Sequence, residues 1–206
     1  MRPRGCCGRW LVTTPGALAV LFVAGACGRL TGRADGTRPD TIATTAEVAL
    51  PGDSELIEGV AASDPLPPLS VPDLNNVAQP LLPPDDDVTV VNFWASWCSP
   101  CLAEIPQLVA FHDRWKSKRM RVVGVAVASG TAVEIREFAA AHRMDYDLLV
   151  MDEGAARRYL GALHLPASLP ITLVVDRRGV IRRKFFGPHT TPQFTAAARE
   201  ALSTPE

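Results

Sequence analysis

The sequence predicts a single three-layer α/β domain with a mixed central sheet, preceded by a long N-terminal extension. Strand-like and helix-like patterns alternate from residue 88 to the C-terminus, as expected when helices cover both faces of a sheet. Eleven of the thirteen aromatic residues lie from Phe93 onward, which places the hydrophobic core in the same region. Two late strand-like runs flank Arg177-Arg178-Gly179, a hairpin signal with glycine at the turn.

The strands are predicted from runs of β-branched and apolar residues. Residues 88–93 form the first such run, and residues 121–127 are almost continuously apolar, which is typical of a strand covered on both faces. A shorter run covers residues 147–151. The hairpin strands are predicted over 171–176 and 180–186.

The helices are predicted between these strands and after them. The first should run from Pro100 to about Lys118, because proline is well tolerated in a first helical turn. The spacing of its apolar residues predicts an inward stripe that consists of Ile105, Leu108, Val109, Phe111 and Trp115. The other helices are predicted over 133–142, 153–163 and 191–202.

The sequence Cys98-Ser99-Pro100-Cys101 lies where the first strand gives way to the first helix. Free N–H groups and the macrodipole at a helix N-terminus favour the thiolate, which is the reactive form of cysteine. Two intervening residues let the pair close a small disulfide ring and open it again. The motif predicts thiol–disulfide exchange, in which Cys98 attacks a partner disulfide and Cys101, one turn deeper, resolves the mixed disulfide.

Two other interpretations of the cysteine pair are weaker. A structural zinc site needs about four ligands, and the remaining cysteines, Cys6, Cys7 and Cys27, all lie in the N-terminal segment. The histidines, which are His112, His142, His164 and His189, lack ligand spacing. A purely structural disulfide across so small a loop contributes little loop-closure entropy. We therefore expect no metal and no cofactor besides the cysteine pair itself.

The stretch from Asn92 to Pro106 resembles the active-site signature of thioredoxin-fold proteins. More narrowly, it resembles the membrane-tethered extracytoplasmic branch that includes the TlpA, ResA and CcmG/DsbE-like proteins. That branch tends to have asparagine where ordinary thioredoxin has an acid, matching Asn92, and a glutamate that matches Glu104. The resemblance covers about residues 70–206 and implies a thioredoxin fold with the αβ insertion of this branch.

The resemblance implies a functional role for Glu104, which follows Cys101 by three residues and so shares its helical face. A partly buried carboxylate there would raise the thiol pKa values by like-charge repulsion or carry the proton of Cys101. Asn92 cannot titrate. A solvated helix acid is the alternative interpretation of Glu104.

The resemblance also implies a set of substrate-binding residues around the pair. Pro170 matches the cis-proline of the family, with Pro166 as a competing candidate, and the backbone of Leu169 should pair with a bound partner chain. With Pro100 among them, the two residues between the cysteines resemble the dipeptide of reducing thioredoxins. Trp97 should pack beside the cysteines and limit solvent access.

The N-terminus indicates export and anchoring. A positively charged start, an apolar stretch over 18–26 and small residues directly before Cys27 resemble a signal peptide with a bacterial lipobox, so residues 1–27 should be processed and Cys27 acylated. An uncleaved membrane helix is the alternative. The proline-rich residues 28–69, without aromatics, should form a flexible tether. Residues 70–206 should form the thioredoxin-like domain.

These features predict a thiol–disulfide oxidoreductase on the outer face of a bacterial cell membrane. We expect it to reduce protein disulfides, for example in cytochrome c maturation, with electrons from a CcdA/DsbD-like membrane partner. A disulfide-forming oxidase, a peroxidase and a non-catalytic binding lipoprotein are the alternatives. The net charge of −1 gives no indication of nucleic-acid binding.

Overall fold

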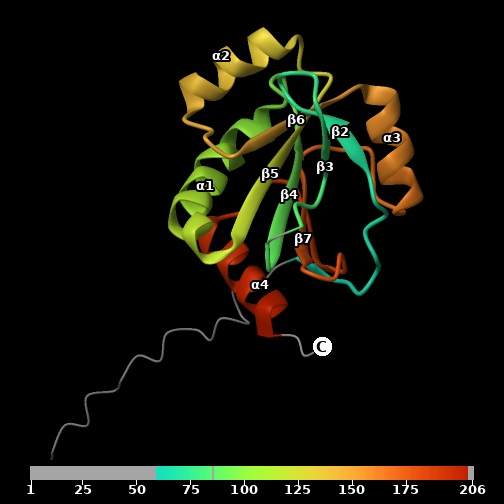
Figure 1. Ribbon diagram of the computed structural model, residues 1–206, viewed down its shortest axis with the longest axis vertical. Helices are drawn as coiled ribbons and strands as arrows, with labels where there is room; N and C mark the ends of the chain where they lie inside the picture. Colours follow the sequence, from blue (N-terminus) through green and yellow to red (C-terminus); the bar gives the residue numbers. More distant parts are fainter. Residues whose placement is uncertain (1–58, 85, 204–206) are drawn as a thin grey trace, which may run out of the picture. The chain divides into compact units, whose positions relative to one another are not determined.

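From residue 88 onward, strands and helices follow one another in the predicted order, and three short strands that were not predicted precede them (Figure 1). A computed structural model describes residues 59–84 and 86–203, so the predicted signal peptide, Cys27 and most of the predicted tether lie outside the described residues. The strands are β1 (Val60–Ala61), β2 (Ser70–Pro72), β3 (Ala78–Pro80), β4 (Val88–Trp94), β5 (Met120–Val127), β6 (Asp147–Met151), β7 (Ile171–Asp176) and β8 (Ile181–Phe186). The helices are α1 (Ser99–Trp115), α2 (Ala132–His142), α3 (Glu153–Ala162) and α4 (Thr191–Ser203).

The predicted boundaries agree with these elements to within a few residues. The clearest difference is the end of the first helix, where Lys116–Lys118 form a short 3-10 helix instead of a last α-helical turn. Arg119 ends this segment with a positive φ of 57°. Within residues 59–84 and 86–203, no helix is both long and apolar enough to cross a bilayer.

The six-stranded sheet is mixed, with the strand order β1-β8-β7-β4-β5-β6. The central strand β4 runs parallel to β5 and antiparallel to β7, and Phe93 lies opposite Ile171. Because of this antiparallel pairing, the end of β4 and the start of β7 meet at the same edge of the sheet. The cysteine motif and the loop containing Pro170 are thereby brought to one place.

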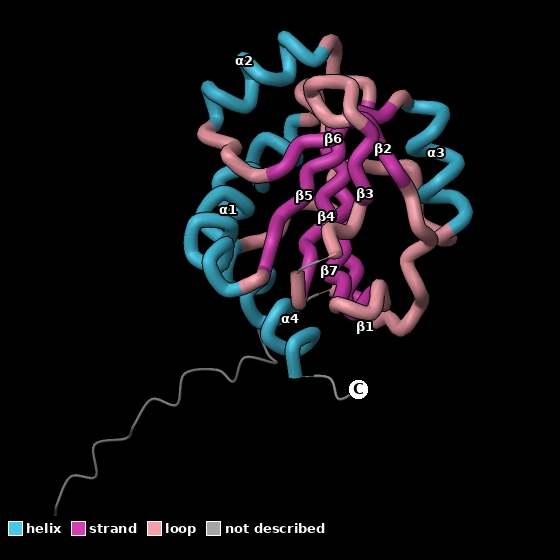
Figure 2. Tube along the Cα trace, viewed as in Figure 1, coloured by secondary structure: helices cyan, strands magenta, loops and turns pink. Residues whose placement is uncertain are grey.

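Two hydrophobic clusters cover the two faces of the sheet, which confirms the predicted three-layer arrangement. One cluster joins α1, α2 and α4 to the sheet and contains Trp94, Phe111 and Phe194. The other contains Phe93 and Leu160 and joins α3 to the opposite face. Figure 2 shows α1 and α2 on one side of the strands and α3 on the other. Adjacent residues of β4 therefore belong to different clusters, because successive side chains of a strand point to opposite faces of the sheet.

The ordered structure extends further toward the N-terminus than the predicted domain start at residue 70. Val60–Ala61 pairs with β8, and Leu66 is buried with its N–H bonded to the carbonyl of Gly179 at 2.7 Å. The β2–β3 hairpin follows, with Val71 and Leu81 buried. Strands of two or three residues among prolines carry too little periodicity for sequence patterns to indicate them.

Candidate active site

Cys98 is the N-cap residue of α1, and it forms a disulfide with Cys101. The two Cα atoms are 5.2 Å apart. The backbone N–H of Cys101 donates to the sulfur of Cys98 at 3.3 Å, so a helix N-terminal donor faces the sulfur that would become the thiolate. Cys98 is 6% exposed and Cys101 only 1% exposed, so an approaching partner meets Cys98 first.

The active-site loop before α1 is fastened to the loop after β5. The N–H of Ser96 donates to the hydroxyl of Ser129 at 3.1 Å, and the indole N–H of Trp97 donates to the carbonyl of Ala128 at 3.0 Å. Trp97, next to Cys98 in the sequence, is 66% exposed, whereas Trp94 is fully buried. Trp94 is thus a core residue, and Trp97 presents an anchored apolar surface beside the pair.

The peptide bond between Leu169 and Pro170 is cis. Pro170 is buried directly before β7, while the competing candidate Pro166 is exposed. The carbonyl of Pro170 accepts a hydrogen bond from the N–H of Gly187 at 3.0 Å. This bond ties the Leu169–Pro170 loop to the segment that follows β8.

Glu104 lies one turn below Cys101 on α1 and is only 1% exposed. Its Oε2 atom accepts hydrogen bonds from the amide of Asn92 at 2.7 Å and the hydroxyl of Thr172 at 3.3 Å. Its Oε1 atom accepts the backbone N–H of His189 at 3.0 Å. Burial raises the pKa of Glu104 to about 7, although these three hydrogen bonds act to lower it. Glu104 is therefore not a solvated helix acid but a buried group that can exchange a proton near neutral pH.

The partners of Glu104 are the part of the site that sequence reasoning missed. The sequence identifies Asn92 as a match to the extracytoplasmic branch and as a residue that cannot titrate, and Thr172 as a strand residue, but it indicates no contact of either with Glu104. The available signal was a polar side chain at each position within a mostly apolar strand, and it was weak, because each strand holds a second polar residue, Thr89 in β4 and Asp176 in β7. Only the register of β4 against β7 shows that Asn92 and Thr172 are direct neighbours.

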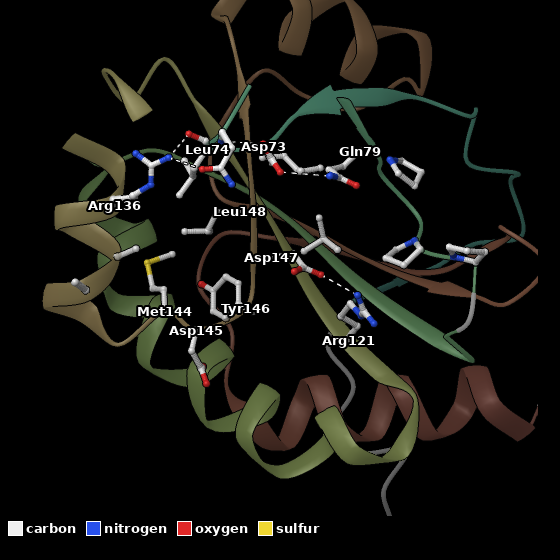
Figure 3. Close-up of a pocket in the computed structure, with 18 residues that line it drawn as sticks. Asp73, Leu74, Gln79, Arg121, Arg136, Met144, Asp145, Tyr146, Asp147 and Leu148 are labelled. Carbon is white, nitrogen blue, oxygen red and sulfur yellow. Dashed lines mark hydrogen bonds and ion pairs between the residues drawn. The ribbon is translucent and has the colours of Figure 1, made fainter. Parts of the chain in front are cut away.

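A separate cavity of about 900 Å³ lies at the β6 edge of the sheet, between α2 and the β2–β3 hairpin (Figure 3). Its cations are already bonded, since Arg136 donates to Leu74 and Asn75 while Arg121 pairs with Asp147. None of the predicted site residues within the described part of the chain lines this cavity.

A thioredoxin fold whose C-x-x-C disulfide caps a helix, with a cis-proline loop beside it, defines a thioredoxin-like thiol–disulfide oxidoreductase. The redox group is the cysteine pair itself. The chain belongs to the AhpC/TSA family, which it matches over residues 63–184, more than half of its 206 residues.

Known proteins confirm the predicted resemblance. The chain is 33% identical to the thiol:disulfide interchange protein HelX of Rhodobacter capsulatus, over 54% of this chain and 58% of that protein. It is 25% identical to sporulation thiol-disulfide oxidoreductase A of Bacillus subtilis, over 54% of this chain and 67% of that one. The fold is similar to that of a secreted thiol-disulfide isomerase from Corynebacterium glutamicum, with a TM-score of 0.61 at 22% identity, covering 68% of this chain and 86% of the other.

Proposed function

We propose that the protein is a membrane-tethered extracytoplasmic reductase of protein disulfides. The observation that carries this proposal is the burial of Glu104 beneath the cysteine pair. A carboxylate there disfavours a second negative charge on Cys98, and a less stable thiolate makes the dithiol the better electron donor. The haem-binding cysteines of cytochrome c are a suitable substrate class, and a CcdA/DsbD-like membrane protein is a suitable electron source. The motif's resemblance to the extracytoplasmic branch supports both assignments.

The reduction potential decides the direction of the reaction. Strong oxidants of this fold lie near −120 mV with a cysteine pKa of about 3.5, whereas thioredoxin lies near −270 mV. We expect this protein to have a potential of about −250 mV or below and a Cys98 pKa near or above 6, because Glu104 destabilises the thiolate. Equilibration of the protein against glutathione and dithiothreitol buffers measures the potential. A value above about −180 mV would favour the oxidase instead.

Anchoring rests on Cys27, which lies outside the described residues. If Cys27 is acylated, Cys27→Ala should abolish lipid attachment and release the protein from membranes. Mass spectrometry of the mature N-terminus and membrane fractionation measure the two effects, with Cys7→Ala as a control that should change neither. An unprocessed N-terminus that stays with the membrane would support the uncleaved helix.

A further inference from the structure

We propose that Asn92 and Thr172 are positioning residues that hold the carboxyl group of Glu104 and set its affinity for a proton. The proposal deepens the proposed function, because Glu104 can serve disulfide exchange only if its protonation changes in the working pH range. Neither residue hydrogen-bonds a sulfur atom of the cysteine pair, and both act through Glu104.

The hydrogens available around Glu104 determine which group donates and which accepts in each hydrogen bond. The amide nitrogen of Asn92 carries two hydrogens, and it lies 2.7 Å from Oε2 of Glu104 and 2.8 Å from the hydroxyl oxygen of Thr172. The Thr172 hydroxyl, which accepts from Asn92, keeps its own hydrogen for Oε2 at 3.3 Å. With the N–H of His189 on Oε1, three donors surround the carboxyl group. These three donors stabilise the ionised form of the Glu104 carboxyl group relative to its neutral form.

The sheet fixes the two side chains rigidly. Asn92 and Thr172 lie directly opposite each other on β4 and β7, and they are 1% and 0% exposed. A buried polar side chain costs stability unless it is bonded, and a valine would fill the volume of Thr172 in an apolar strand. Bonds to Glu104 and to each other thus account for the amide nitrogen of Asn92 and the hydroxyl of Thr172, whereas Oδ1 of Asn92 is buried without a hydrogen-bond partner among the described residues.

The other titratable groups around Glu104 do not replace these donors. Tyr146, which precedes β6, has its pKa raised mainly by burial and also by Glu104, so its phenol stays neutral. The ring of His189 bonds to the carbonyl of Gly187, and only its backbone N–H reaches Glu104. Cys98 and Cys101 complete the group, and they carry no charge while they form the disulfide.

The test is a pH titration of the Glu104 carboxyl group in the oxidised full-length protein. Carbon-13 NMR of the glutamate carboxyl carbons gives the midpoint, with Glu104→Gln used to assign the signal. We expect Thr172→Val and Asn92→Leu each to raise the midpoint from about 7, by about one pH unit, a tenfold change in proton affinity. Thr89→Val is the matched control, because Thr89 is also a buried threonine and lies on β4, but it is not among the hydrogen-bond partners of Glu104.

A purely structural role for these residues predicts a different result. It would lower the melting temperature of the variants and leave the midpoint in place, and that outcome overturns the proposal. Thr172→Ser, which keeps the hydroxyl group, should keep the original midpoint while Thr172→Ala raises it, so the comparison holds even if the larger substitutions disturb folding. A reduction potential above about −180 mV together with raised midpoints would reject the proposed reductase and leave this inference standing.

Discussion

Cys101→Ala should accumulate mixed disulfides with protein partners through Cys98, whereas Cys98→Ala should form none. The reason is that Cys98 is the more exposed sulfur and has a helix N-terminal N–H directed at it, while Cys101 is 1% exposed. Without Cys101 no thiol resolves the mixed disulfide, and without Cys98 no thiol attacks the partner. Turnover of protein disulfides should therefore stop completely in both variants. Non-reducing electrophoresis detects the trapped complexes, and mass spectrometry identifies the linked cysteine.

Ser99→Ala provides the control for the trapping experiment. Ser99 lies between the cysteines, and its replacement keeps both thiols. This variant should trap no partner and should keep its turnover. If trapping occurred through Cys101 in the Cys98→Ala protein, the assignment of attacking and resolving residues would have to be reversed.

Glu104→Gln should remove a fall in the stability of the oxidised protein between pH 4.5 and 7. The pKa of Glu104 rises from 4.5 to about 7 on folding, mainly because the carboxyl group is buried. Below pH 4.5 the group is protonated in both states, and its stabilising contribution is fully present. As the pH rises, the unfolded chain releases the proton first, so the free energy of unfolding falls by about 3 kcal/mol until the folded group ionises near 7.

Urea unfolding at a series of pH values measures this effect. Glutamine cannot ionise, so the fall in stability attributable to Glu104 should be absent from the variant. In the reduced protein, the same change should lower the pKa of Cys98, because it removes a neighbouring negative charge. Glu134→Gln is the control: hydrogen bonds from Thr131 lower the pKa of this exposed residue, so its titration lies below the window. An unchanged slope in Glu104→Gln would show that Glu104 does not titrate in this range.

The sequence was sufficient for the elements that form the core. The apolar runs of β4, β5 and β7 and the inward stripe of α1 have the periodicity that burial requires, and each is present at the predicted place. The position of Cys98 at the helix start followed from the same reasoning, since a strand ends and a proline begins the next helix within a few residues. Periodic segments are predictable because their own burial determines their structure.

The environment of Glu104 could not be predicted in this way. Its donors come from three segments far apart in the chain, at Asn92, Thr172 and His189. No local sequence pattern predicts these contacts, because they depend on strand register and on the course of the loop after β8. The short strand β1 was missed for a related reason, since its pairing with β8 is what orders it.

If a partner docks on the Leu169–Pro170 loop, as we expect, docking and proton uptake by Glu104 are linked equilibria. Through Gly187 and the N–H of His189 the Leu169–Pro170 loop connects to Oε1 of Glu104, and through Thr172 it connects to Oε2. A partner that displaces this loop changes the proton affinity of Glu104, and pH must then change the affinity for that partner by the same factor. We expect such docking to be accompanied by net uptake or release of protons, which calorimetry would record as a binding heat that varies with the ionisation enthalpy of the buffer.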